Sequence, residues 1–211
     1  MFIDLLVLLV AVPVGAFVWT FTEYAAHRFT MHNVGGRGPA AKEHLMHHAQ
    51  PERSRAFVRT LGHIGMYTTA VAIGWLLSQI APWSLAFGLA AGWATGYTIY
   101  EAFHWMAHHR APRGIVDLQL RRRHFHHHFV APRTNLGVTT DFWDGLFGTE
   151  AELSTIKVPR RLAMPWLTDN DGQVRPEFAA DYVIVGRLTR TPEQEAADIT
   201  EAFADRPVSL Q

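Results

Sequence analysis

The chain of 211 residues contains no cysteine. This absence excludes disulfides, thiolate zinc sites, cysteine-ligated iron–sulfur clusters and cysteine nucleophiles. The chain also lacks an excess of either charge, because 19 acidic residues balance 19 Lys and Arg, so we expect no nucleic-acid partner. Any metal ion that this protein binds must therefore be held by nitrogen and oxygen atoms.

Two long stretches lack residues with a formal charge. The first runs from Leu5 to Thr22, close to the roughly 20 residues of a bilayer-spanning helix, and Asp4 stands where a cleaved signal peptide would carry a basic residue. The second runs from Thr60 to Tyr100, about twice the length of one span, with Pro82 near its middle. We interpret the second stretch as a helical hairpin that turns at residues 81–83 and whose small residues let membrane helices approach closely.

These stretches predict an all-α integral membrane protein with about three apolar spans and a cytoplasmic, histidine-rich helical cap. One span precedes the polar segment Glu23–Arg59, and a two-span hairpin separates that segment from the residues after Glu101, so both polar segments lie on one side. Both segments are rich in Arg, which places them and the active site in the cytoplasm. The alternative for each apolar run is a buried helix of a soluble protein, but soluble helices this long and uncharged are uncommon.

The composition changes after Gly148, where a polar stretch of mixed character begins. We expect residues 1–149 to form the membrane domain and residues 150–211 to form a polar cytoplasmic tail that contributes no chemistry. Within this tail, Thr191 and Gln194 form a capping box that predicts a short helix to about Asp205.

Thirteen histidines are the most unusual feature of the composition. All except His63 fall into four clusters, and all four clusters lie in the two polar segments. A purification tag would be contiguous, whereas these clusters are spaced along the chain. The candidate metal ligands in the four clusters are His27, His32, His44, His47, His48, His104, His108, His124, His127 and His128.

The spacing within the clusters suggests how these side chains meet. Residues three and four apart share a face of an α-helix, so we expect the ligands within residues 44–48 to converge on one point, and those within residues 124–128 to do the same. His27 and His32 are five apart, about 140° around an α-helix, and suit two neighbouring metals better than one. Ten imidazoles exceed what one ion accepts, which indicates two ions, and imidazole suits iron, zinc, copper or nickel.

Other polar residues near the clusters receive separate interpretations. His63 stands alone, and His109 and His126 point away from the faces shared by their neighbours, so we do not expect these three to be ligands. Glu23 and Glu101 are placed to accept the second ring proton of a ligating histidine, a common arrangement at metal sites.

The segments HRFTMH, EHLMHH, YEAFHWMAHH and RRRHFHHHF, followed by NLGVTTDFWDGLFGT, occur in this order between Trp19 and Thr149. This pattern closely resembles the fatty acid hydroxylase and sterol desaturase superfamily, and its later segments are most similar to the fatty acid and ceramide 2-hydroxylase type. The resemblance implies two iron ions bound by the ten histidines, dioxygen as cosubstrate and hydroxylation of a fatty acyl, sterol-like or carotenoid lipid. Tyr100 and Glu101, which open the third segment, are candidate catalytic residues.

The resemblance also implies an electron donor. Some relatives carry a cytochrome b5 domain at the amino terminus, and this chain does not, so we expect electrons from a separate protein of the ferredoxin or cytochrome b5 type with its reductase. Three alternatives stay open from the sequence. A lipid desaturase would use the same centre, a metal transporter or sensor would need ionisable ligands within the spans, and a di-metal hydrolase would usually include metal-binding carboxylates.

Overall fold

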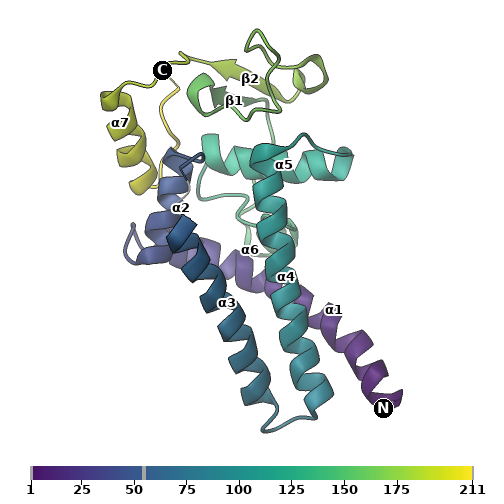
Figure 1. Ribbon diagram of the computed structural model, residues 1–211. Coiled ribbons are helices and arrows are strands. Elements are labelled where there is room, and N and C mark those ends of the chain that lie inside the picture. Colours follow the sequence, from purple (N-terminus) through teal and green to yellow (C-terminus); the bar gives the residue numbers. More distant parts are fainter. Residues whose placement is uncertain (1, 54–55, 211) are drawn as a thin grey trace. The chain divides into compact units, whose positions relative to one another are not determined.

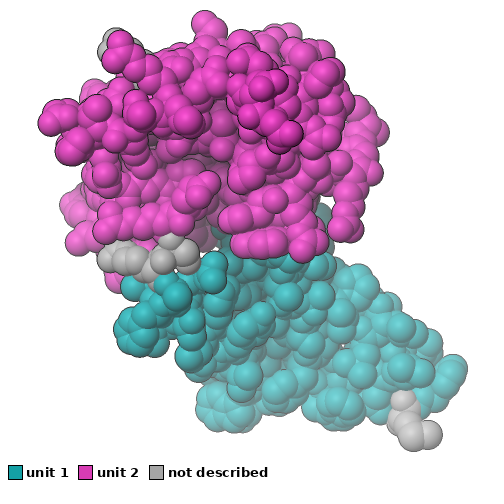
Figure 2. All heavy atoms as spheres, turned by 45° about the horizontal axis from the view of Figure 1, so that its top comes forward, with its two compact units in different colours: residues 1–23, 54–102 teal, residues 24–53, 103–211 magenta. Residues whose placement is uncertain are grey.

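The computed structural model describes residues 2–53 and 56–210 and divides into two compact units. Unit 1 comprises residues 1–23 and 54–102, and unit 2 comprises residues 24–53 and 103–211 (Figure 2). The elements shown in Figure 1 are α1 (Phe2–Ala25), η1 (Ala26–His32), α2 (Pro39–Ala49), α3 (Ala56–Leu77), α4 (Trp83–His109), α5 (Ile115–Phe129), α6 (Phe142–Phe147), β1 (Ile156–Pro159), η2 (Arg160–Leu162), η3 (Pro176–Phe178), β2 (Tyr182–Val185) and α7 (Pro192–Phe203).

Unit 1 contains the apolar helices that the uncharged stretches predict. The helical hairpin is confirmed, because α3 ends at Leu77, a turn follows and α4 begins at Trp83, directly after Pro82. Among the described residues, one continuous helix, Phe2–His32, is long and apolar enough to cross a membrane. The structure therefore supports one of the three expected spans by length and composition.

Small residues set the distance between α1 and α4 within unit 1. A Cβ atom added to Gly92 would lie 2.0 Å from the Val12 carbonyl oxygen, and one added to Gly15 would lie 2.1 Å from that of Leu89. A Cβ atom added to Gly96 would lie 2.5 Å from the Cβ atom of Trp19. The spacing of small residues thus serves a close approach of two helix backbones, as the sequence predicted.

Unit 2 corrects the all-α prediction. Strands β1 and β2 pair in parallel, with Ile156 opposite Tyr182 and Val158 opposite Ile184. Each strand has only four residues, too few for an alternating pattern to stand out in the sequence. Figure 1 shows this small sheet near the C-terminus, with α7 beside α2.

The segment after residue 149 packs as part of unit 2, together with residues 24–53 and 103–149. Ile156, Leu167 and Tyr182 are buried in one apolar cluster with Phe125 of α5. The Trp166 indole Nε1 donates a hydrogen bond of 2.8 Å to the Ala107 carbonyl of α4. The capping box at the start of α7 is confirmed.

We expect Gly92→Ala to lower the free energy of unfolding by about 1–3 kcal/mol, because the added methyl group must push α1 away from α4. Gly65→Ala on α3 is the matched control, since its methyl group meets nothing within 4 Å. Thermal unfolding in detergent compares the two variants. Equal midpoints for both variants would contradict the close packing of these helices.

Candidate metal centre

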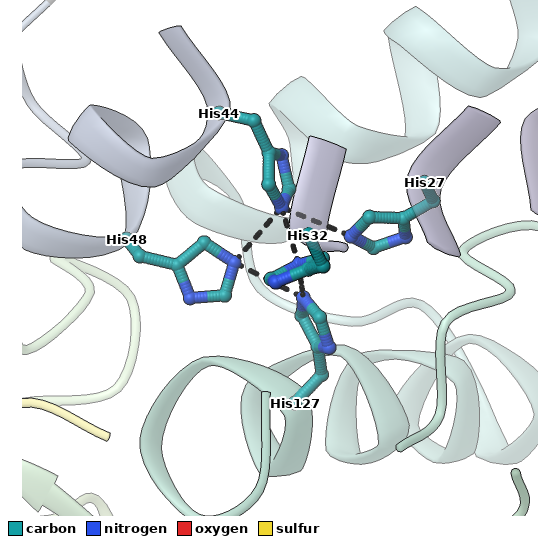
Figure 3. Close-up of side chains that lie close together, drawn as sticks. All are labelled: His27, His32, His44, His48 and His127. Carbon is teal, nitrogen blue, oxygen red and sulfur yellow. Dashed lines mark hydrogen bonds between the residues drawn. The ribbon is translucent and has the colours of Figure 1, made fainter. Parts of the chain in front are cut away.

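The ten candidate ligands form two groups of five side chains, both within unit 2. One ring nitrogen of each side chain lies within 4.8 Å of those of the other members of its group. The first group, shown in Figure 3, contains His27, His32, His44, His48 and His127. The second group contains His47, His104, His108, His124 and His128.

Helices α2 and α5 each supply both groups, which corrects the expectation that each cluster converges on one point. His44 and His48 of α2 join the first group, whereas His47 joins the second. In α5, His124 and His128 join the second group and His127 the first. A step of four residues rotates a side chain by about 40° and a step of three by about 60° in the opposite direction, so only the four-residue pairs stay together.

His27 and His32 lie in the same group, although their five-residue spacing predicted two different metals. The reason is local: η1 is a π-helix that continues α1. A π-helix forms hydrogen bonds between residues five apart, so these side chains lie one turn from each other. Their ring centroids are 5.0 Å apart.

Three members of the first group have a fixed tautomer. His27 Nδ1 donates to the Leu136 carbonyl at 2.5 Å, and His127 Nδ1 donates to the Thr134 carbonyl at 3.1 Å. His32 Nδ1 lies 2.5 Å from the Asp205 carboxylate. Because carbonyl and carboxylate oxygens accept hydrogen bonds, Nδ1 of each ring carries a proton, which leaves Nε2 as the nitrogen that can bind a metal ion.

The Nε2 atoms of this group converge on one point, as Figure 3 shows. His44 Nε2 lies 3.0, 2.8 and 3.0 Å from the Nε2 atoms of His27, His32 and His48. One nitrogen with a single hydrogen or lone pair cannot bond to three others at once. Metal–nitrogen bonds of about 2.1 Å place ligands at right angles about 3.0 Å apart, so the group fits a metal ion with several imidazole ligands.

Ring nitrogens of the second group also lie close together. His108 Nε2 lies 3.1 Å from His47 Nε2 and 3.0 Å from His124 Nε2. Both ring nitrogens of His128 are buried without a hydrogen-bond partner among the described residues, as is Nδ1 of His124. A buried polar atom without a partner is costly, and a bound cation would satisfy His128 Nε2.

The electrostatic environment favours the neutral form of the candidate ligands on α2 and α5 by lowering their pKa values. Burial, together with the positive charge that neighbouring imidazoles would carry, lowers the pKa of His44 and His127 well below the ordinary value. Burial likewise lowers the pKa of His47 to about 4. Neutral imidazole is the form that binds metal ions, so the site is set for coordination at neutral pH.

A model of the fatty acid hydroxylase family matches residues 12–149, more than half of the chain. This chain belongs to the fatty acid hydroxylase family. Dihydroceramide fatty acyl 2-hydroxylase FAH1 of Arabidopsis thaliana is 33% identical over 161 residues, which cover 71% of this chain and 63% of that relative. Fatty acid 2-hydroxylase of Rattus norvegicus is 29% identical over 64% of this chain and 38% of its own length.

A solved structure, full-length Scs7p with only the hydroxylase domain visible, is also similar to this fatty acid hydroxylase family member. It matches with a TM-score of 0.54 and 27% identity over 70% of this chain and 57% of that one. The chain therefore spans less than two thirds of the length of these relatives.

The histidines not expected to be ligands lie outside both groups. His63 Nδ1 lies 2.5 Å from the Tyr97 hydroxyl, and His109 stacks on Trp105. The amide Nδ2 of Asn135 donates to His126 Nδ1 at 3.2 Å, and its Oδ1 accepts from the Ala151 backbone N–H. His126 Nδ1 is thus an acceptor, the tautomer opposite to that of the three fixed rings in the first group.

The residues that orient the rings were mostly missed from the sequence. Glu23 was expected to accept the second ring proton of His27, but the Leu136 carbonyl takes that position. Leu136 is itself fixed by buried Asp144, which accepts hydrogen bonds from the Leu136 and Gly137 N–H groups at 2.8 and 2.7 Å. Backbone carbonyls have no sequence signature, so their contribution could not be foreseen.

Tyr100 and Glu101 belong to unit 1, whereas all ten candidate ligands belong to unit 2. The Tyr100 ring packs near Trp19 and Tyr97, at centroid distances of 6.0 and 6.5 Å. Glu101 is partly buried. Their catalytic role stays a prediction.

We expect His127→Ala to lower the metal content from about two ions per chain, because it removes one of five convergent nitrogens. His126→Ala, which alters another buried histidine of the same helix, should retain the metal. Elemental analysis at matched folded yield measures both. Equal metal loss in the two variants would mean that His126 also reaches the centre.

Proposed function

We propose that this fatty acid hydroxylase family member is a membrane enzyme that inserts one oxygen atom of dioxygen into a carbon–hydrogen bond of a lipid. Two iron ions, one in each group of five histidines, would form its redox centre. The convergence of Nε2 atoms at 2.8–3.2 Å in the first group carries this proposal. The family match supplies the reaction class.

The donor set favours redox chemistry over hydrolysis. All members of both groups are imidazoles, and no carboxylate belongs to either group among the described residues. Hydrolytic di-metal sites usually include carboxylate ligands, whereas a structural zinc needs only four ligands in total. When bound, iron would activate dioxygen and remove hydrogen from an unactivated carbon.

The chain itself supplies orientation and a dry environment. Burial of His124, His127 and His128 keeps water from the ring nitrogens, and the carbonyl partners of the outer nitrogens hold the rings in place. Glu101 lies three residues before His104 in the sequence of α4, and we propose that it and Tyr100 hold or move protons during the reaction. Two electrons would come from a ferredoxin or cytochrome b5 type protein with its reductase, and with two protons they would reduce the second oxygen atom of dioxygen to water.

The names of the relatives favour a fatty acyl substrate. They include a dihydroceramide fatty acyl 2-hydroxylase and fatty acid 2-hydroxylases, so we propose hydroxylation at carbon 2 of a free or ceramide-linked acyl chain. The apolar helix Phe2–His32 and the hairpin α3–α4, which lacks formal charges from Thr60 to Tyr100, favour an enzyme embedded in the membrane. The Arg-rich polar segments favour an active site on the cytoplasmic side.

We expect a host that expresses the chain to accumulate 2-hydroxylated acyl lipids carrying heavy oxygen when it grows under isotopically labelled dioxygen. Mass spectrometry of its lipids checks both the added oxygen and its position. His124→Ala at matched expression is the control, and it should abolish the product because it removes a second-group nitrogen.

Lipids that lose two hydrogen atoms instead of gaining oxygen would identify a desaturase and overturn the proposed hydroxylation. Unlabelled oxygen in the product would exclude dioxygen as its source.

A further inference from the structure

The C-terminal segment places a carboxylate against the first group of histidines. Asp205 Oδ1 lies 2.5 Å from Nδ1 of His32, and its Oδ2 accepts from the Arg133 guanidinium. The side chains of His32 and Asp205 are only 1% and 6% exposed. Within the first group, the fixed outer-nitrogen partners of His27 and His127 are backbone carbonyls, so the His32 contact differs in carrying a negative charge.

We propose that Asp205 is a positioning residue for the metal-binding ring of His32, so that the segment after residue 149 completes one of the two metal sites. This inference rests on the proposed metal binding by the first group. It assigns a role to a segment that lies outside the matched family region, residues 12–149.

The position of Asp205 is set by its backbone conformation and by the packing of Phe203, two residues before it. Asp205 follows α7 with a positive φ of 60°, which turns the chain sharply after the helix. The Phe203 ring packs against Gly36 in the loop after His32, so close that a Cβ on Gly36 would lie 2.7 Å from it. The end of α7 is therefore held against the same loop that follows the histidine.

A buried ion pair holds the rest of α7 in place. Arg161 of η2 donates to Asp198 of α7 at 2.6 and 2.9 Å, and both side chains are at most 1% exposed. Arg190 donates to the Ala49 carbonyl at the end of α2 and also lies 3.4 Å from Asp198. The Arg190 contacts link α7 to α2, the helix that carries His44 and His48.

The chemistry of the contact gives Asp205 an effect on the metal through His32. A carboxylate that accepts the Nδ1 proton fixes the ring orientation, keeps the lone pair on Nε2 and makes that nitrogen a stronger donor. Loss of such a partner typically costs about 10- to 100-fold in metal affinity. In the second group, the Nδ1 atoms of His124 and His128 have no such partner within the part of the chain that the structure describes.

The test measures Co²⁺ retention in the full-length protein, which does not depend on hydroxylation. Asp205→Ala removes the acceptor, Asp205→Asn keeps an acceptor oxygen without the charge, and Asp171→Ala removes an exposed carboxylate elsewhere in unit 2. Each protein is loaded with Co²⁺ and treated with a chelator, and the metal left per chain is followed over time. Thermal unfolding of the metal-free proteins reports whether the fold is intact.

We expect Asp205→Ala to release one of its ions about 10- to 100-fold faster than the wild type and the other at the wild-type rate. Asp205→Asn should recover part of the loss, and Asp171→Ala should match the wild type. Equal release from Asp205→Ala and the wild type would overturn the role of Asp205 but leave the proposed function standing.

Two further outcomes separate the inference from the proposed function. A wild type that binds two Co²⁺ ions but produces no hydroxylated lipid when reconstituted with iron and a reductant would defeat the proposed function alone. A wild type that binds no Co²⁺ would defeat both. Equal acceleration of both ions in Asp205→Ala, with a lowered unfolding midpoint, would assign Asp205 a purely structural role and overturn the inference.

Discussion

The arrangement of unit 2 depends on bringing several nitrogen lone pairs to the same point. Neutral imidazoles whose Nε2 atoms face one another at about 3 Å repel each other unless a cation lies between them or a proton is shared. The fold opposes that repulsion by fixing the outer nitrogen of three rings, through the carbonyls of Thr134 and Leu136 and the carboxylate of Asp205. A cation at the centre would convert the repulsion into attraction.

Residues 134–151 explain how a short, irregular segment can serve this purpose. Asn135 has a positive φ of 51°, and its backbone N–H donates to the Thr149 carbonyl. Asp144 then holds the N–H groups of the next two residues, which leaves the Leu136 carbonyl directed at His27. Burial raises the pKa of Asp144, while its hydrogen bonds oppose that rise. The segment therefore holds the Leu136 carbonyl, and through it the His27 ring, in a fixed orientation.

The sequence allowed the apolar helices, the turn before Trp83 and the capping box of α7 to be predicted, because each rests on local rules of charge, proline and capping. The ten histidines could be named from their clusters, and the structure places all of them in two groups. The placement of His27 and His32 in one group could not be predicted, because the π-helix there departs from α-helical spacing. The Asp205 contact spans 173 residues, and no local pattern reports such a distance.

The two groups depend on the same orientation of α2 and α5, because both helices carry histidines of both groups. His47 and His48 are adjacent on α2 but serve different groups, and His127 and His128 do the same on α5. The rings of His48 and His128, one from each group, stack at a centroid distance of 4.2 Å. Rotation of either helix to improve one group would therefore withdraw a ligand from the other. Two groups fixed in this way suit the proposed function, which would need two ions at a set separation.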